Sequence, residues 1–344
     1  MRAKIVGLYA LLAAGNLLAW GWAVTAFKDD AVLLGTAFLA YTFGLRHAVD
    51  ADHIAAIDNI TRKLMQEGKR PVGVGFYFSL GHASVVAIAT AAVALTASAL
   101  QTRFDYLRNL GGLIGTSISV FFLFSVAAAN IFVLAAVHRS FRNVRRGGTL
   151  EEEDLDSFLA KRGFLARLFR PLFRLIGKSW QMFPLGFIFG LGFETATEIA
   201  LLGIAAEAAK GHSIQSIMVF PALFAAGMTL VDTTDSVLML GAYGWAFVKP
   251  VRKLYYNLVI TFVSVVVAVV IGGIEALGLV ADRLGFDGPF WSAVILLNRN
   301  FGSLGYVIIA IFVASWAISI AVYRLKRYDE LEVAGSPLRP PPPF

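Results

Sequence analysis

The sequence has no cysteine among its 344 residues, so it cannot form a disulfide framework, a thiolate metal site or a cysteine redox switch. Charged residues are also scarce. They make up 15% of the chain, against about 25% in soluble domains, while 58% of the residues are hydrophobic and the mean hydropathy is +0.70. This composition excludes an ordinary soluble domain and predicts a protein that crosses a lipid bilayer several times.

Eight apolar segments are each long enough to span a bilayer, which takes about 20 residues. We expect these spans at residues 4–27, 33–60, 72–100, 110–137, 181–208, 214–247, 255–280 and 302–323. Several exceed the length needed, which favours tilted or kinked helices. The sequence therefore predicts an all-α fold of eight transmembrane helices in a single domain over residues 1–330. The Pro-rich tail 331–344 is expected to be extended or disordered.

Basic residues are concentrated in alternate connections between the predicted spans. With the N-terminus in the cytoplasm, the cytoplasmic segments carry 23 of the 30 Lys and Arg residues and the opposite side carries six. Positive charge marks cytoplasmic loops, so both termini are expected inside, with a long cytoplasmic loop at 139–180. The net charge of +7 then reflects topology, and we expect no nucleic-acid partner.

Two motifs that would indicate an enzyme are missing. The segment around Gly177 and Lys178 lacks the first glycine of a phosphate-binding loop, because Leu172 stands at that position. The H-E-x-x-H pattern of a helical zinc protease is also missing. We therefore predict that the protein is not an enzyme, and nothing in the chain implies an ATPase subunit.

Ionisable side chains nevertheless recur inside four of the predicted spans. Each costs about 2.5–3.5 kcal/mol at the centre of a membrane helix, so six unpaired acids would cost about 15–20 kcal/mol. That exceeds the usual stability of a folded protein, so these groups must contact one another, a cation or water. The set comprises His47, Asp50, Asp52, His53, His82, Glu194, Glu198, Asp232 and Asp235.

Helical spacing indicates which members of the second span converge. His47, Asp50 and His53 fall within about 120° of one helix face, whereas Asp52 points to the opposite side. His47 and His53 lie about 9 Å apart along a straight helix axis. Both can reach one ion only if the helix is kinked, and two successive sites are the alternative. By the same spacing, the acids of the fifth span share a face, as do those of the sixth.

Histidine combined with carboxylate suits borderline divalent cations such as Ni²⁺, Co²⁺ or Zn²⁺. Any single buried histidine or aspartate is more often a structural hydrogen-bonding group, but three intramembrane histidines with six acids favour a metal-cation site. A proton-coupled transporter of another solute remains the alternative, although such a site rarely needs paired histidines.

Four motifs occur in order: "RHAVDADHI", "FSLGHASVV", "LGFETATEIA" and "GMTLVDTTDS". Together with the eight-span layout and Asn16 in "NLLAWGWA", they resemble the NiCoT family of nickel/cobalt transporters. The resemblance implies high-affinity uptake of Ni²⁺ and/or Co²⁺ by a secondary transporter of the bacterial cytoplasmic membrane, with the metal as substrate and no cofactor. Export of the same metals is an alternative, but the 139–180 loop lacks the histidines that such exporters often carry.

The resemblance also implies roles for individual residues. His47, Asp50 and His53 match the family's metal-recognition core, and Asp52 and His82 match further motif positions. We expect His82 to supply a third imidazole, Asn16 an amide ligand or an orienting group, and Asp52 a partner for Arg46 or a neighbouring helix. Glu198, Asp232 and Asp235 are candidate outer-sphere acceptors, path carboxylates or interhelical hydrogen-bonding groups. Glu194 has the same candidate roles but departs from the family pattern, which usually has Asp there.

Overall fold

The computed structural model describes residues 2–96, 101–146, 176–191, 196–209, 211–246, 250–326 and 328. The secondary structure assigned over these ranges is entirely helical. Its elements are α1 (Arg2–Ala26), α2 (Ala31–His47), α3 (Ala51–Gln66), α4 (Val74–Thr96), α5 (Gln101–Arg145), η1 (Ser179–Gln181), α8 (Met182–Gly190), α9 (Ala196–Ala208), α10 (Ile214–Ile217), α11 (Val219–Ala246), α12 (Pro250–Leu284), α13 (Pro289–Arg299) and α14 (Phe301–Leu325). The predicted all-α fold is confirmed for the described residues.

Six of these helices are long and apolar enough to cross a membrane, and α2 with α3 makes a seventh candidate span that is bent by 51°. These seven match the predicted spans other than 181–208. That segment contains α8 and α9, and residues 192–195 between them, which include Glu194, lie outside the described part of the chain. The Pro-rich tail lies outside it as well.

Two details of the sequence reading are wrong. The fourth predicted span ends at 137, but α5 continues to Arg145 and shortens the expected 139–180 loop. The 23 basic residues expected in cytoplasmic segments include Arg62 and Lys63, which follow the predicted end of the second span at residue 60, yet both lie on α3 and are only 1% and 5% exposed. Both side chains are held by polar partners, which the pattern of apolar residues does not reveal.

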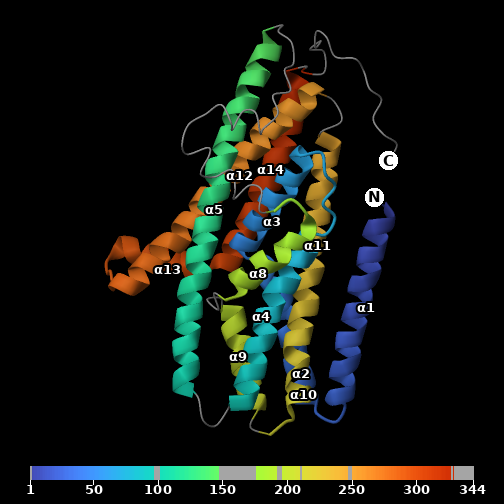
Figure 1. Cartoon of the computed structure of the whole chain (residues 1–344), viewed down its shortest axis with the longest axis vertical. Coiled ribbons are helices and arrows are strands. Elements are labelled where there is room, and N and C mark those ends of the chain that lie inside the picture. Colours follow the sequence, from blue (N-terminus) through green and yellow to red (C-terminus); the bar gives the residue numbers. More distant parts are fainter. Residues whose placement is uncertain are drawn as a thin grey trace.

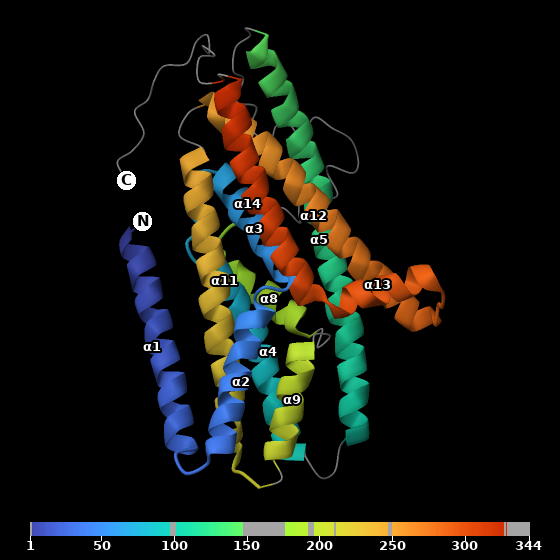
Figure 2. The ribbon, with the colours of Figure 1, turned by 180° about the vertical axis from the view of Figure 1, so that it is seen from behind.

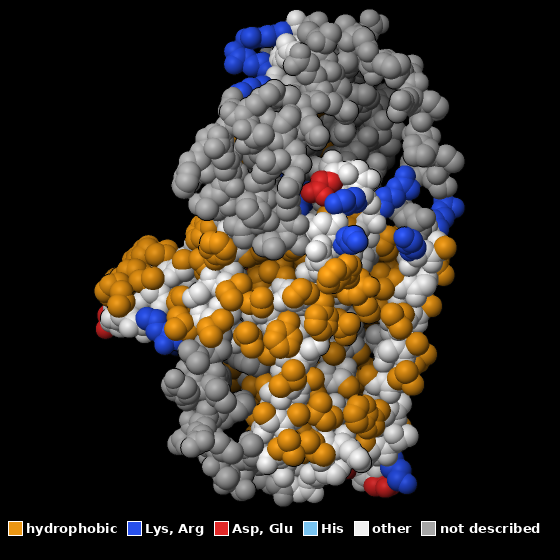
Figure 3. Space-filling model, in the orientation of Figure 1, with side chains coloured by type: hydrophobic (Ala, Val, Ile, Leu, Met, Phe, Trp, Pro, Cys, Tyr) orange, Lys and Arg blue, Asp and Glu red, His pale blue; other side chains and the backbone are white. Residues whose placement is uncertain are grey.

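The helix ends gather at two opposite sides of the molecule (Figure 1). The start of α1, the end of α3, the end of α5, the end of α11 and the end of α14 lie toward one side, uppermost in the view. The connections from α1 to α2 and from α9 to α11 lie at the other. Figure 3 shows Lys and Arg mainly on the upper side, above a broad band of apolar side chains. This band is the surface expected of a protein embedded in lipid.

The helices form two groups, with α3 between them (Figure 2). In the first helix group, α11 packs against α1, α2 and α4, and α4 packs against α8 and α9. The second helix group comprises α5, α12, α13 and α14, and its largest interface joins α5 to α12. α3 contacts α11 and α4 on one side and α12, α14 and α5 on the other. Apart from α3, the two groups touch mainly where α5 meets α8 and α11 meets α12.

Glycines allow close packing inside the first helix group. A Cβ atom on Gly81 would overlap the carbonyl oxygen of Phe183, and one on Gly186 would overlap that of Phe78. Gly227 approaches Tyr41 in the same way. Small residues permit such backbone contact between membrane helices. The close approach holds α4 and α8 in place, and α4 carries one of the site histidines.

Candidate metal centre

Three buried histidines converge from three helices. His47 ends α2, His53 lies in the first turn of α3, and His82 lies in the middle of α4. One ring nitrogen from each falls within 4.8 Å of the others. The three side chains are 2%, 0% and 3% exposed. The structure therefore brings together the three intramembrane histidines that the sequence singled out.

A break between α2 and α3 makes this convergence possible. The helix stops after His47 and resumes at Ala51, and Asp50 adopts an extended conformation as the residue before α3. The 51° bend brings the rings of His47 and His53 to a centroid distance of 4.7 Å. The predicted kink is confirmed, and it removes the axial separation that a straight helix would impose.

Carboxylates orient two of the imidazoles. His47 Nδ1 lies 2.8 Å from Asp50 Oδ2, and His53 Nδ1 lies 3.2 Å from Asp232 Oδ2. An ionised carboxylate only accepts hydrogen bonds, so opposite it a neutral imidazole carries its hydrogen on Nδ1 and keeps the lone pair on Nε2. Metal-binding histidines usually have such an outer acceptor, which sets the tautomer and the ring orientation.

The Nε2 atoms of His47 and His82 lie beside the same carboxylate. His47 Nε2 and His82 Nε2 are 2.9 Å apart, and Glu198 Oε1 lies 2.9 Å from the latter and 3.7 Å from the former. His53 Nε2 is buried and makes no hydrogen bond. In a tetrahedral site, nitrogens about 2.0–2.1 Å from one ion lie about 3.3 Å from each other. Three imidazoles and one carboxylate thus come close to the geometry that a divalent cation requires.

Aromatic rings enclose the cluster. Phe224 packs 5.4 Å from His47 between ring centroids, and Phe78 packs 4.9 Å from His53. Both phenylalanines are fully buried. An apolar wall excludes water and strengthens electrostatic interactions with a bound cation.

The remaining predicted site residues lie elsewhere. Asn16 donates to the backbone oxygen of Leu12 and accepts from the Tyr41 hydroxyl, so it joins α1 to α2. Asp52 is partly exposed, and no ion pair links it to Arg46, which is also described. Asp235 lines a cavity beyond Asp232, with its Oδ2 buried and without a hydrogen bond. Glu194 lies outside the described residues.

A second buried polar cluster, which the sequence did not predict, begins five residues after His53. Asp58 accepts hydrogen bonds from the Tyr243 and Ser264 hydroxyls, and Arg62 lies one turn further along α3. The signal available in the sequence was the i,i+4 spacing of an acid and a base on one helix face. The predicted second span ends at residue 60, so Arg62 falls outside it.

The chain matches the NicO family, described as high-affinity nickel-transport protein, over residues 33–322. It is 61% identical to the "High-affinity nickel transport protein" of Cupriavidus necator over 333 residues, which cover 96% of this chain and 95% of the relative. It is 42% identical to the "Cobalt transport protein NhlF" of Rhodococcus rhodochrous over 298 residues, covering 86% and 84% of the two chains. No solved structure matches. The chain therefore belongs to the NicO family of high-affinity nickel-transport proteins and is a multi-pass membrane protein.

Proposed function

We propose that this protein imports Ni²⁺ and/or Co²⁺ across the cytoplasmic membrane as a secondary transporter. The observation that carries the proposal is the convergence of His47, His53 and His82 in the interior of a membrane protein of this family. Its relatives include proteins named for nickel transport and one named for cobalt transport.

In this proposal the three histidines and Glu198 bind the ion directly. Imidazole nitrogen and carboxylate oxygen are suitable donors for Ni²⁺, Co²⁺ and Zn²⁺, and they discriminate weakly between the first two. Asp50 and Asp232 do not bind the ion in this proposal. Each accepts a hydrogen bond from the Nδ1 atom of a histidine whose Nε2 binds the ion. Asn16, Asp52 and Asp235 have no contact with the cluster that would make them ligands.

The proposal includes eight spans with both termini in the cytoplasm. It is supported by the placement of the helix ends: the start of α1 and the ends of α3, α5, α11 and α14 lie on one side (Figure 1). Most of the Lys and Arg side chains that Figure 3 colours lie toward these ends, and positive charge favours the cytoplasmic face.

Import needs no ATP when the membrane is polarised. Moving one charge inward is worth about 2.3 kcal/mol per 100 mV, so a dication gains about 4.6 kcal/mol. This is enough to favour inward transport by more than a thousandfold at equilibrium, because each 1.4 kcal/mol is about tenfold. A carrier that exposes the site alternately to the two sides can use this gradient directly.

The decisive test is uptake of radiolabelled Ni²⁺ and Co²⁺ by cells that express the chain. We expect accumulation at low external concentration and a slower rate after a protonophore collapses the potential. His82→Ala should abolish uptake, whereas His138→Ala, which alters an exposed histidine on α5, should leave it intact. A metal content below that of control cells would indicate export, and uptake of neither metal would refute the proposal.

A further inference from the structure

The second buried polar cluster contains an antiparallel ladder between α3 and α12. Three residues on one face of α3, at positions 58, 62 and 66, meet three on one face of α12, at positions 264, 261 and 257. We call this set the polar ladder. Its rungs are Ser264 Oγ to Asp58 Oδ2 at 2.6 Å, Arg62 Nη1 to Thr261 Oγ1 at 2.9 Å and Gln66 Nε2 to Asn257 Oδ1 at 2.6 Å.

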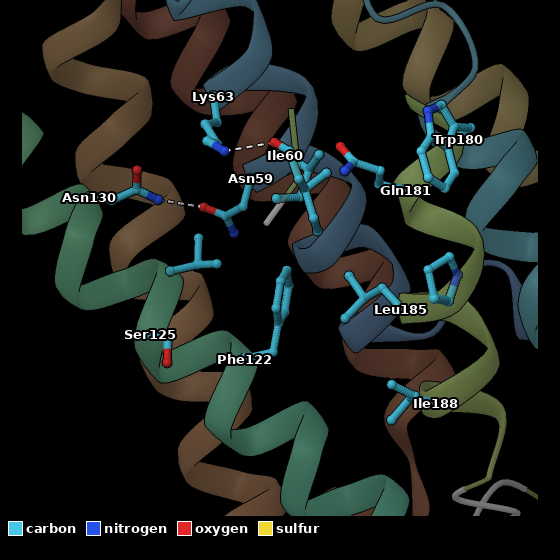
Figure 4. Close-up of a pocket in the computed structure, with 13 residues that line it drawn as sticks. Asn59, Ile60, Lys63, Phe122, Ser125, Asn130, Trp180, Gln181, Leu185 and Ile188 are labelled. Atoms are coloured by element: carbon cyan, nitrogen blue, oxygen red, sulfur yellow. Dashed lines mark hydrogen bonds between the residues drawn. The ribbon is translucent and has the colours of Figure 1, made fainter. Parts of the chain in front are cut away.

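A neighbouring bond extends the attachment to α5. Asn59 accepts from both Arg62 Nη2 and Asn130 Nδ2, at 2.9 and 2.7 Å. Figure 4 shows Asn130 pointing from α5 toward Asn59 on α3. The polar face of α3 is thus bonded to two helices of the second helix group.

The face of α3 toward α4 and α8 is apolar, whereas α11 of the first helix group makes two polar contacts with α3, from Tyr243 to Asp58 and from Asp232 to His53. Ile57, Ile60 and Leu64 are buried against α4 and α8, in a cluster that contains Phe78 and Met182. Separating apolar side chains inside a bilayer costs little, because lipid tails are as apolar as the side chains they replace. Leaving α11 would remove one neutral hydroxyl donor, Tyr243, from Asp58. Leaving α12 would remove the partners of both Asp58 and Arg62 and expose two ionisable groups to lipid, at a cost of several kcal/mol. α3 should therefore stay with α12 whenever the two helix groups move apart.

Incomplete packing marks the boundary where such movement can occur. A cavity of about 330 Å³ lies between α8 and α5, with Asn59, Ile60 and Lys63 of α3 on its wall (Figure 4). A second cavity, of about 200 Å³, lies where α11 faces α12 and α14, and Ile54 of α3 lines it. Both cavities separate the first helix group from the second, and α3 borders each of them.

The boundary between the two helix groups also divides the candidate ligands of the histidine cluster. His47, His82 and Glu198 belong to the first helix group, while His53 is carried by α3. The non-helical residues 48–50 join the two parts and give α3 a hinge directly between His47 and His53.

We propose that the polar ladder makes α3 a moving part of the second helix group, so that His53 approaches or leaves the other ligands as the two groups close or separate. A bound ion draws the groups together by bonding to both. Asp58, Arg62 and their α12 partners are then positioning residues, which act on the ion through His53. This inference rests on the proposed transport of a metal ion by the histidine cluster.

The chain lacks cysteine, so pairs of engineered cysteines can be cross-linked without interference. The pair Gln66→Cys with Asn257→Cys would tie α3 to α12, where the native side chains meet. The pair Lys63→Cys with Ile176→Cys would tie α3 to the segment before η1, where Lys63 Nζ donates to Ile176 O at 2.7 Å. Both pairs lie near the same end of α3, so each is the control for the other.

A short bis-methanethiosulfonate reagent would join each pair, and intact mass would confirm the product. Nickel uptake into proteoliposomes would then be compared before and after reductant. We expect the 63–176 cross-link to reduce uptake at least tenfold, reversibly. The 66–257 cross-link replaces the native rung, so it should leave uptake no lower than in the same variant after reductant. Loss of uptake with the 66–257 link, or retention of uptake with the 63–176 link, would overturn the proposal. If neither the parent chain nor the variants before cross-linking take up Ni²⁺, the proposed function itself is wrong.

A second measurement needs no cross-link. A reporter cysteine at Ser125, on the wall of the 330 Å³ cavity, should react with maleimide several-fold more slowly when Ni²⁺ closes the groups. Ser264→Ala removes one rung and should weaken this protection by Ni²⁺. Ser119→Ala is the matched control, because its hydroxyl also donates to a buried carboxylate, Glu275 Oε2, but within the second helix group. Equal protection in both variants would contradict a role for the ladder.

Discussion

Replacing Asp232 with Asn tests how the carboxylate behind His53 supports the proposed site. Asp232 is fully buried on α11, and its Oδ2 lies 3.2 Å from His53 Nδ1. An ionised carboxylate can only accept, so it favours the neutral tautomer with hydrogen on Nδ1, which leaves Nε2 available to a cation. The amide of Asn can also donate, and in that orientation it stabilises the other tautomer, in which Nε2 carries the hydrogen and cannot bind a metal.

The expected effect follows from the role of such outer acceptors. Their loss weakens metal affinity about 10–100-fold, which corresponds to about 1.4–2.7 kcal/mol. Asp232→Asn should therefore raise the dissociation constant for Co²⁺ or Ni²⁺ by this factor while the protein still inserts and elutes normally in detergent.

Calorimetric titration of the purified protein, or the visible absorption of bound Co²⁺, would measure the change. Asp235→Asn is the control, since this carboxylate lies one turn further along α11 and makes no hydrogen bond to a histidine. An unchanged affinity in Asp232→Asn, or an equal loss in both variants, would refute the orienting role.

Three further changes probe other parts of the site. Glu198→Gln should weaken Ni²⁺ binding about tenfold or more, measured by the same titration, because it removes the charged oxygen beside His82. Gly305→Ala should lower metal affinity, because the added Cβ would overlap the Val49 carbonyl in the hinge, and should lower the free energy of unfolding by about 1–3 kcal/mol. Gly273→Ala is the control, because its Cβ would meet open space, and it should change neither quantity. Glu194→Asp should alter the Ni²⁺/Co²⁺ uptake ratio several-fold if that carboxylate contacts the ion, and an unchanged ratio removes it from the site.

Composition and spacing were sufficient to predict the all-helical fold and the identity of the three histidines. Intramembrane charge is costly, so every such residue stands out against an apolar background. The kink could also be predicted, because His47 and His53 lie too far apart on a straight helix to share an ion. These features depend on local spacing, which a single sequence displays directly.

The partners across helices could not be predicted in the same way. Nothing in the order of residues indicates that Asp232 meets His53, or that Asn16 bonds to Tyr41 rather than to the cluster. Arg62 falls outside the predicted second span because a charged residue near the end of an apolar segment normally marks a loop. Its burial depends on Thr261, about 200 positions later, and such long-range pairs appear only when the helices are placed in space.

The position of Asp232 connects the metal site to the proposed movement of α3. Asp232 belongs to the first helix group, so a departing His53 would lose its carboxylate acceptor at the same time as the ion. The contact of His53 with Asp232 and its bond to the ion would form together when the groups close, and each would make the other more favourable. In the proposed movement a bound ion would therefore stabilise the closed arrangement by more than its bond to a single nitrogen. If the groups separate as proposed, His47, His82 and Glu198 would remain around the ion, and a site with fewer donors would release its metal more readily.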